Sequence, residues 1–338
     1  MLWAVAAATV LAFEDELNPN RDRWDSPRQH ELGAAVDVWS RWDSEWYLRI
    51  AESGYDWPSS TPAFFPLYPL LVGCLGRVLG GHFLLAGLVV SLAAGAVAFA
   101  LLYRLVRRRF RPDDAFRSVV YLALFPTSLF LALAIATFVL VEERRVGWAS
   151  VTAGLALLTR PYGVALLPAL AVYAWRSDRR RRDLALLGVP VALFLMFPVA
   201  LELSLGHGLA FVDAQHVWQR SLAPLGPLGG LVQAVGEGDV LGPLLALALL
   251  ALAVVAWRRI GAPYGVYAVV AVAVPMALPS ERLGGLYSFP RLALAAFPCL
   301  IALALLGRDR RAHLVAVTVL AAWLGVNVVR WALWYWVA

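Results

Sequence analysis

Long apolar stretches dominate this sequence and limit what it can fold into. Eight of them are at least 18 residues long and hold no more than one charged residue each. A bilayer crossing needs about 20 apolar residues in a helix, because lipid offers no partner for unpaired backbone groups. With 61% apolar and 15% charged residues, the chain is predicted to be an integral membrane protein. The stretches lie at 83–105, 115–141, 148–175, 184–204, 239–257, 262–279, 290–307 and 312–337.

The fold class expected from this pattern is all-α, a polytopic helical bundle with about 8–11 transmembrane segments. No internal repeat or low-complexity linker divides the chain, so residues 1–338 are assigned to a single membrane domain. Within it, residues 14–82 form a long first extracytoplasmic loop with interfacial helices, and residues 83–338 hold the transmembrane helices. Residues 1–13 are apolar, too short to span and without the basic start of a signal peptide. They are expected to be the end of a first helix.

The charges orient this bundle. All 29 basic residues are arginine, and most lie in short runs between the apolar stretches, at 104–111, 176–182, 258–259 and 308–311. The positive-inside rule places these runs on the cytoplasmic side. Residues 14–62 then lie outside and carry eleven acidic and five basic residues. We therefore expect a multi-pass protein of the cytoplasmic membrane, and topology explains the net charge of +6 better than nucleic-acid binding does.

Two regions leave the topology open. Residues 64–80 resemble a helix, but a crossing there would place the run at 104–111 outside, so a juxtamembrane or re-entrant segment is predicted. The stretch from 115 to 175 is interrupted by the charged residues 142–145. Each half forms either one tilted helix or two short ones. With single helices Arg144 and Arg145 would lie outside, against the positive-inside rule, and Arg160 would sit near mid-membrane.

The most informative motif is RWDSEWYLRIAESGY, from Arg41 to Tyr55. A continuous helix would align its aromatic residues in a stripe suited to the membrane interface. The members of this predicted stripe are Trp39, Trp42, Trp46 and Ile50.

Asp43 lies at the edge of this predicted stripe, where a carboxylate is poorly solvated unless it is paired. It is either the partner of Arg41 or of a distant arginine in a structural ion pair, or a catalytic carboxylate. A metal shared with Glu45 is not expected, because residues two apart on a helix point about 200° from each other. The histidines show no metal-ligand spacing, and hydrolase and nucleotide-binding motifs are absent.

Further candidates lie beside or within the predicted spans. Arg160 in LTRPYG precedes the helix-breaking Pro161, and Arg291 in SFPR opens a span from its outer end. Each is either a snorkelling or ion-paired arginine or a phosphate ligand. In FVDAQHVWQRSL, Gln215 and Trp218 align with Phe211, a combination suited to sugar hydroxyls and ring faces but also to an interfacial anchor. The C-terminal aromatics, Trp331 to Trp336, are sufficiently explained as an interface belt.

These motifs together resemble a known family. RWDSEWYLRIAESGY, AFFPLYPLL at 63–71, LFPTSLFL at 124–131, LTRPYG at 158–163, FVDAQHVWQRSL at 211–222 and SFPR at 288–291 are similar, in this order, to PIG-V-type mannosyltransferases. The resemblance implies a GT-C glycosyltransferase fold and assigns Asp43 the role of catalytic base. Arg160 and Arg291 then become candidates to hold the donor phosphate. The other candidate substrate contacts are Arg41, Trp42, Glu45, Tyr47, Gln215 and Trp218.

The implied reaction moves mannose from polyprenyl-phosphate-mannose to a lipid-linked glycan or glycolipid at the outer face of the membrane. The leaving group is a polyprenyl phosphate, so no soluble cofactor and no metal site are predicted, while dependence on a divalent metal stays open. A partner subunit is possible by analogy with the eukaryotic relatives. Two alternatives remain: the same fold acting on another polyprenyl-linked sugar, and a transporter of lipids or solutes.

Overall fold

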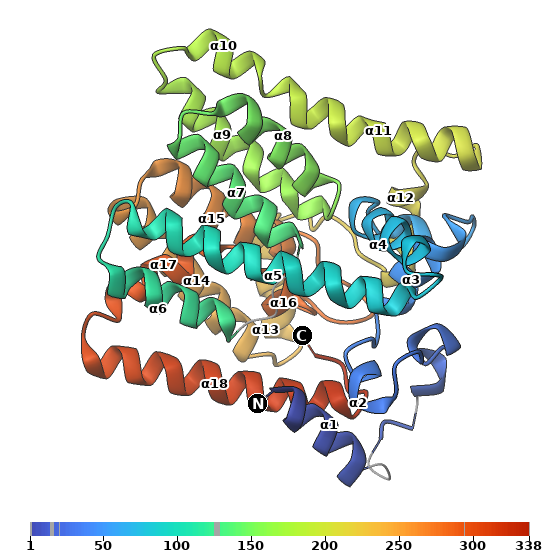
Figure 1. Ribbon diagram of the computed structural model, residues 1–338. Helices are drawn as coiled ribbons and strands as arrows, with labels where there is room; N and C mark the ends of the chain where they lie inside the picture. The colour runs from blue at the N-terminus through green and yellow to red at the C-terminus, as the bar shows by residue number, and fades with distance from the viewer. Residues whose placement is uncertain (1, 14–16, 20, 125–128, 294, 338) are drawn as a thin grey trace.

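The computed structural model describes residues 2–13, 17–19, 21–124, 129–293 and 295–337 (Figure 1). In this part of the chain the regular structure is helical, with two isolated β-bridges, Arg220 with Ser280 and Ser280 with Gly284. The all-α prediction is therefore confirmed. Four helices are long and apolar enough to cross a membrane. They are α5 (Phe83–Arg107), α10 and α11 taken together (Arg180–Ala185 and Gly188–Leu205), α14 (Leu241–Arg259) and α18 (Arg310–Ala332).

The remaining apolar stretches contain shorter helices. In the first half of the chain these are α6 (Pro112–Ala123), α7 (Leu129–Glu142), α8 (Val146–Leu157), the 3₁₀ turn η5 (Pro161–Ala165) and α9 (Leu166–Trp175). In the second half they are α15 (Ala262–Met276), α16 (Phe289–Ala293) and α17 (Phe297–Leu306). Four of the eight predicted spans are thus single long helices, and the other four hold helices shorter than a full crossing.

The region left open by the sequence consists of two helical hairpins. Glu142, at the end of α7, pairs with Arg109 just beyond α5 at 2.6 Å, and Glu143 pairs with Arg104 and Arg108. α6 starts at this end as well, because Asp114 binds Arg308, which precedes α18. α6 and α7 therefore leave this end and return to it, and α8 and α9 do the same (Figure 1). Two short helices thus replace each of the predicted spans 115–141 and 148–175. Residues 144–145 then lie at the same end as the other arginine runs.

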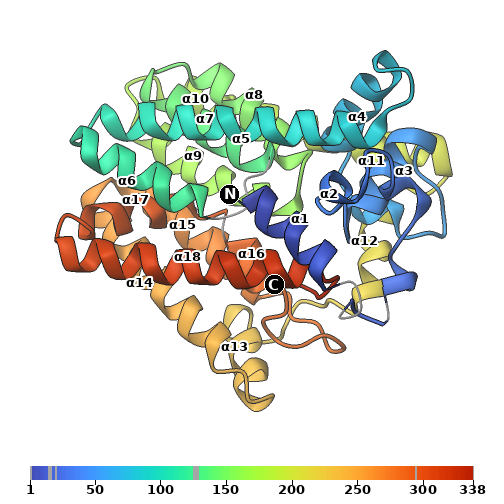
Figure 2. The same ribbon diagram turned by 60° about the horizontal axis from the view of Figure 1, so that its bottom comes forward.

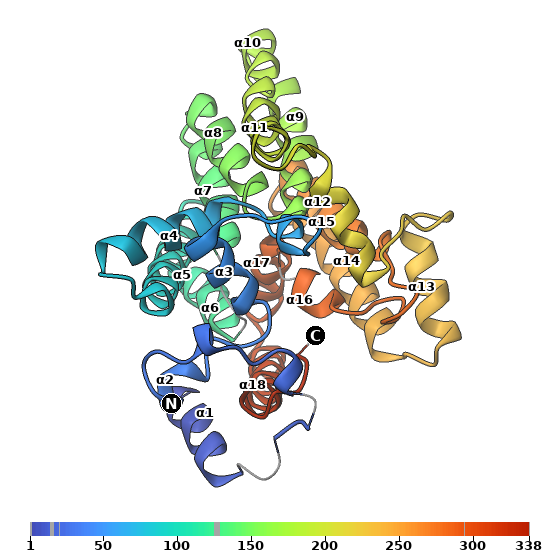
Figure 3. The same cartoon turned by 90° about the vertical axis from the view of Figure 1, so that its right-hand side faces the viewer.

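We call the end that gathers residues 104–114, 142–145, 258–264 and 308–313 the arginine-rich end. The opposite, motif end holds α2 (Ala34–Asp37), α3 (Ser44–Ser53), η4 (Thr61–Ala63), α4 (Leu67–Val78), α12 (Ala210–Asp213), η6 (Ala214–Trp218) and α13 (Pro227–Gly236). Figure 3 views the molecule from this motif end. The segment predicted as juxtamembrane, α4, packs on α3 and α5 there. The arginine runs and the acidic first loop therefore lie at opposite ends.

The first apolar residues form α1 (Leu2–Ala12), as predicted. α1 packs against the last third of α18, where Ala6 contacts Val328 and Ala332 (Figure 2). Elsewhere small residues let helices approach closely. A Cβ added at Gly154 of α8 would lie 2.5 Å from Leu193 Cδ1 of α11. Such close contacts are the main source of helix association in lipid, where apolar burial supplies little.

The pairs of Glu143 make the arginine-rich end sensitive to pH. Hydrogen bonding to Arg108, and the charges of Arg104, Arg108 and Arg145, lower the pKa of Glu143 below its ordinary value of 4.5. A lowered pKa means that this stabilisation is present above about pH 4.5 and is lost as the pH falls through the lowered value. We expect Glu143→Gln to lower the unfolding free energy at pH 7 by about 1 kcal/mol or less, because the arginines are exposed.

Thermal unfolding of the purified protein in detergent, at neutral and acidic pH, checks this expectation. The difference between wild type and Glu143→Gln should disappear on the acid side. Asp178→Asn serves as the control, because Asp178 is exposed and has no ion pair among the described residues. A difference that is equally large at pH 3 would contradict the assignment.

Candidate active site

The central motif is a turn followed by a helix, and not one continuous helix. Trp42 has a positive φ of 56°, Asp43 is the N-cap residue, and α3 begins at Ser44. The predicted stripe is therefore wrong at Trp39 and Trp42, which precede the helix. A positive φ at a bulky residue is uncommon, and here it lies in the turn directly before α3.

Asp43 pairs with a distant arginine. Its Oδ2 accepts a hydrogen bond of 2.7 Å from Nη1 of Arg291, in α16, and both side chains are about one third exposed. α16 follows Ser288, which also has a positive φ, of 62°. The sequence left open whether the ion-pair partner of Asp43 is Arg41 or a distant arginine, and the structure shows the distant Arg291. The structure brings together two sequence candidates that are 248 residues apart.

The tip of the second hairpin reaches the same place. Arg160 is extended between α8 and η5, as expected from Pro161, and Leu67 N donates to Leu158 O at 2.9 Å. Tyr47 of α3 interacts electrostatically with Arg160, Asp43 and Arg291, and burial raises the pKa of its hydroxyl. Tyr47 is therefore a neutral hydroxyl in the ordinary pH range. Arg160 therefore lies at the tip of the second hairpin, toward the motif end.

Two further residues of this site, Tyr162 and Arg220, are not among those predicted from the sequence. Tyr162, next to Arg160, interacts electrostatically with Arg220, Arg160 and Arg291. Arg220 donates to the carbonyls of Leu278 and Tyr287, each at 3.4 Å. Both residues belong to motifs that the sequence displayed, LTRPYG and FVDAQHVWQRSL. Their charge and hydroxyl were visible in the sequence, but no periodicity linked them to Asp43 or Arg291, because these residues belong to segments far apart in the chain.

The C-terminal aromatics form a wall of this site. Trp336 stacks on Tyr287 at 5.5 Å, meets Trp42 edge-on at 5.1 Å, and has the guanidinium of Arg291 4.8 Å from its ring centre. Burial raises the pKa of Tyr287 to about 12. Anchoring at the interface is therefore not a sufficient explanation for this segment. It packs on the motif and fixes Arg291 through a cation–π contact.

Arg41, a predicted substrate contact, instead contacts the C-terminal segment. Its guanidinium donates to the carbonyls of Trp331, at 3.1 Å, and Ala332, and lies 4.7 Å from the ring centre of Trp334. The side chain is buried, with 6% exposure. Arg41 thus satisfies backbone carbonyls that the end of α18 would leave unpaired. We assign it the task of holding the C-terminal wall against the motif.

The other candidates from the motif lie on different surfaces. Trp42 is 8% exposed and packs on Trp24 and Trp334 as well as Trp336. Glu45 pairs with Arg28 at 3.3 Å, on the surface that also carries Glu52. It therefore diverges from Asp43, as the helical angle predicted.

The second loop is not the aligned helix that was predicted. It changes from α12 to the 3₁₀ turn η6 at residues 213–214, which breaks the common face of Phe211 and Gln215. Phe211 instead packs on Phe65, Phe194 and Phe197. Among the described contacts none joins Gln215 to Asp43 or Arg291. The side chain of Trp218 and residues 125–128 of LFPTSLFL fall outside the described residues.

Several buried polar atoms around Arg291 have no partner among the described residues. They are Nε of Arg291, Oγ of Ser288 and the indole Nε1 atoms of Trp42 and Trp336. Buried polar groups in native structures are usually hydrogen-bonded, so unpaired donors that lie together are suited to a polar ligand. Within the described residues no group of three His, Cys, Asp or Glu side chains is placed to hold a metal. The site thus offers one carboxylate, three guanidinium groups and phenol hydroxyls.

Comparison with known proteins places the fold. No family model and no curated protein matches this chain. Among solved structures, the chain is similar to ArnT from Cupriavidus metallidurans in the apo state, with a TM-score of 0.50 and 20% sequence identity. The match covers 81% of this chain and 56% of that one, so this chain spans little more than half the length of ArnT. The chain is a polytopic, all-helical membrane protein whose fold is similar to that of ArnT.

Proposed function

We propose that this protein is a glycosyltransferase that uses a polyprenyl-phosphate sugar as its donor. The observation that carries the proposal is the pairing of Asp43 with Arg291, while Arg160, Arg220 and Arg291 all act electrostatically on Tyr162. A carboxylate among guanidinium groups combines a proton acceptor with ligands for a phosphate. The similarity to ArnT, a GT-C-family 4-amino-4-deoxy-L-arabinose transferase, supports the same class of reaction.

In the proposed reaction Asp43 accepts the proton of an acceptor hydroxyl. The acceptor oxygen attacks the anomeric carbon of the sugar, and the bond from that carbon to the phosphate oxygen breaks with inversion. The electron pair of that bond leaves on the polyprenyl phosphate, whose added charge faces the arginines. Stabilising charge where it develops is a major source of rate enhancement, because the guanidinium groups are already in place.

The finer assignment follows the sequence resemblance. We propose mannose as the transferred sugar, a lipid-linked glycan or glycolipid as the acceptor, and the extracytoplasmic face of the cytoplasmic membrane as the place of reaction. The donor carries the activated bond, so no further cofactor is needed in the proposed reaction. The location agrees with the acidic first loop at the motif end, opposite the arginine runs.

The test is transfer of labelled sugar from polyprenyl-phosphate donors into lipid, using membranes that lack the endogenous enzyme. We expect label from polyprenyl-phosphate-mannose with wild-type protein. Label from a different donor, such as the arabinose or glucose form, would retain the reaction class and correct the sugar. Movement of an intact lipid or solute across the bilayer without any transfer product would favour the transporter alternative.

A further inference from the structure

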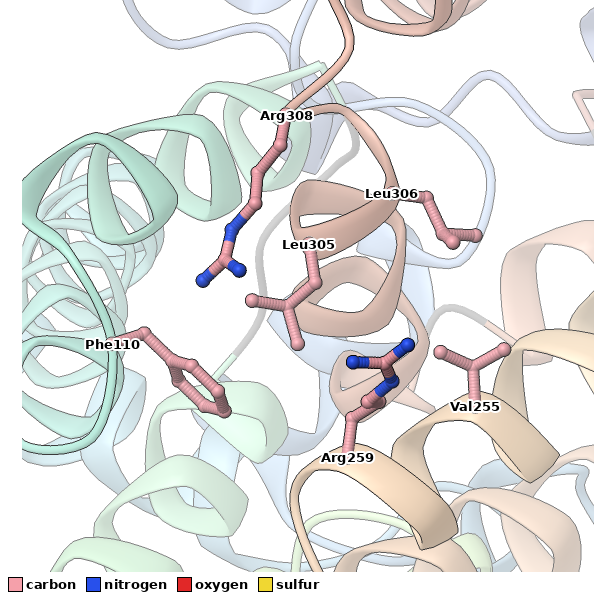
Figure 4. Close-up of a pocket in the computed structure, with 6 residues that line it drawn as sticks. All are labelled: Phe110, Val255, Arg259, Leu305, Leu306 and Arg308. Atoms are coloured by element: carbon pink, nitrogen blue, oxygen red, sulfur yellow. The ribbon is translucent and has the colours of Figure 1, made fainter.

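A cavity of about 290 Å³ lies at the arginine-rich end, far from the Asp43–Arg291 pair (Figure 4). It is formed where α14, α17 and the segment after α5 meet. The lining residues are Phe110, Val255, Arg259, Leu305, Leu306 and Arg308. In Figure 4 the guanidinium groups of Arg259 and Arg308 lie on either side of Leu305. The cavity therefore combines two cationic groups with an apolar surface.

The two arginines differ in how they are held. Arg308 donates from Nε and Nη2 to the buried carboxylate of Asp114, at 3.1 and 2.7 Å, while its side chain remains 46% exposed. Arg259 is exposed and has no ion pair or hydrogen bond to another described side chain. The cavity lining thus holds two guanidinium groups, of which Arg308 is paired with a carboxylate and Arg259 is not. The excess positive charge, with one arginine fixed in position, suits an anionic ligand.

The apolar part of the cavity continues onto the outer surface of the bundle. Leu306, which lines the cavity, is 51% exposed. In an integral membrane protein an exposed apolar side chain on the outside of the helix bundle faces lipid chains. A ligand in this cavity therefore has its charged part beside the arginines and an apolar part against the helices.

From this geometry we propose that the cavity is a binding site for an anionic phospholipid. The phosphodiester lies between Arg259 and Arg308, and the first carbons of an acyl chain lie along Leu305, Leu306 and Val255. Basic pockets between membrane helices are suited to acidic head groups, and each arginine near such a surface changes the affinity about five-fold. The bound lipid joins the ends of α14 and α17. This site is separate from the proposed sugar transfer.

The test uses the purified full-length protein in a neutral detergent. Lipid retention by native mass spectrometry and the shift in melting temperature are measured with phosphatidylglycerol, with phosphatidylcholine of the same chains, and with inorganic phosphate. Arg259→Gln is compared with Arg258→Gln, which removes the same charge from an exposed neighbour that does not line the cavity. Binding is the readout, so the result does not depend on sugar-transfer activity.

We expect phosphatidylglycerol to bind and to raise the melting temperature of wild type and Arg258→Gln, and its affinity for Arg259→Gln to be about five-fold weaker. Equal weakening in both variants would overturn the site, because it would mean attraction to diffuse surface charge. A shift produced equally by inorganic phosphate would show an anion site that does not recognise lipid. Equal binding of phosphatidylcholine would show that the two arginines do not select an anionic head group, and it would also overturn the site.

Discussion

Asp43→Asn is expected to reduce sugar transfer by about 10²–10⁴-fold, the range that a general base contributes. Asn keeps the size and a hydrogen-bond acceptor for Nη1 of Arg291, which lies 2.7 Å from the present carboxylate. It cannot take the proton of the acceptor hydroxyl. The α3 helix and the packing of the C-terminal wall should be retained, so the melting temperature should change little.

The measurement is the initial rate of label transfer at saturating donor, with equal amounts of folded protein. Glu52→Gln is the matched control, because Glu52 lies on the same helix and also pairs with an arginine, Arg28, at 2.6 Å. This control should transfer sugar at the wild-type rate. If Asp43→Asn retained activity within a few-fold of wild type, Asp43 would be only the partner of Arg291 in a structural ion pair.

Arg291→Gln is expected to raise the Michaelis constant for the polyprenyl-phosphate donor by about 10–100-fold, the effect of losing one charge-assisted hydrogen bond to a phosphate. The rate at saturation should fall as well, because the charge on the leaving phosphate is then less stabilised. Arg291→Lys keeps the charge but loses the planar donor geometry and the stacking over Trp336. It should recover only part of the activity.

Donor and acceptor are titrated separately to check this expectation. Arg282→Gln, an exposed arginine in the loop that precedes α16, is the control for loss of charge and should keep both constants. The double variant Asp43→Asn with Arg291→Gln should be less impaired than the sum of the two, since the residues are in direct contact. A change confined to the acceptor constant would contradict phosphate binding by Arg291.

Membrane insertion, the all-helical class and the grouping of the arginine runs were readable from the sequence. These properties depend on length, hydropathy and charge, which are local to each segment and are imposed by the bilayer. The motifs around Asp43, Arg160 and Arg291 were found for the same reason, because a charge beside an apolar segment is conspicuous when its environment excludes water.

The tertiary structure decided how the helices are broken and which motifs meet. An apolar stretch of 27 or 28 residues with a single arginine has the same composition whether it forms one tilted helix or a hairpin. The choice depends on the contacts of Glu142 and Glu143 with the end of α5. The turn at Trp42 and the packing of the C-terminal residues against it leave no helical or strand periodicity in the sequence. Sequence patterns therefore do not predict them. The pairing of Asp43 with Arg291, and the places of Tyr162 and Arg220, arise between loops far apart in the chain, where sequence spacing carries no information on distance.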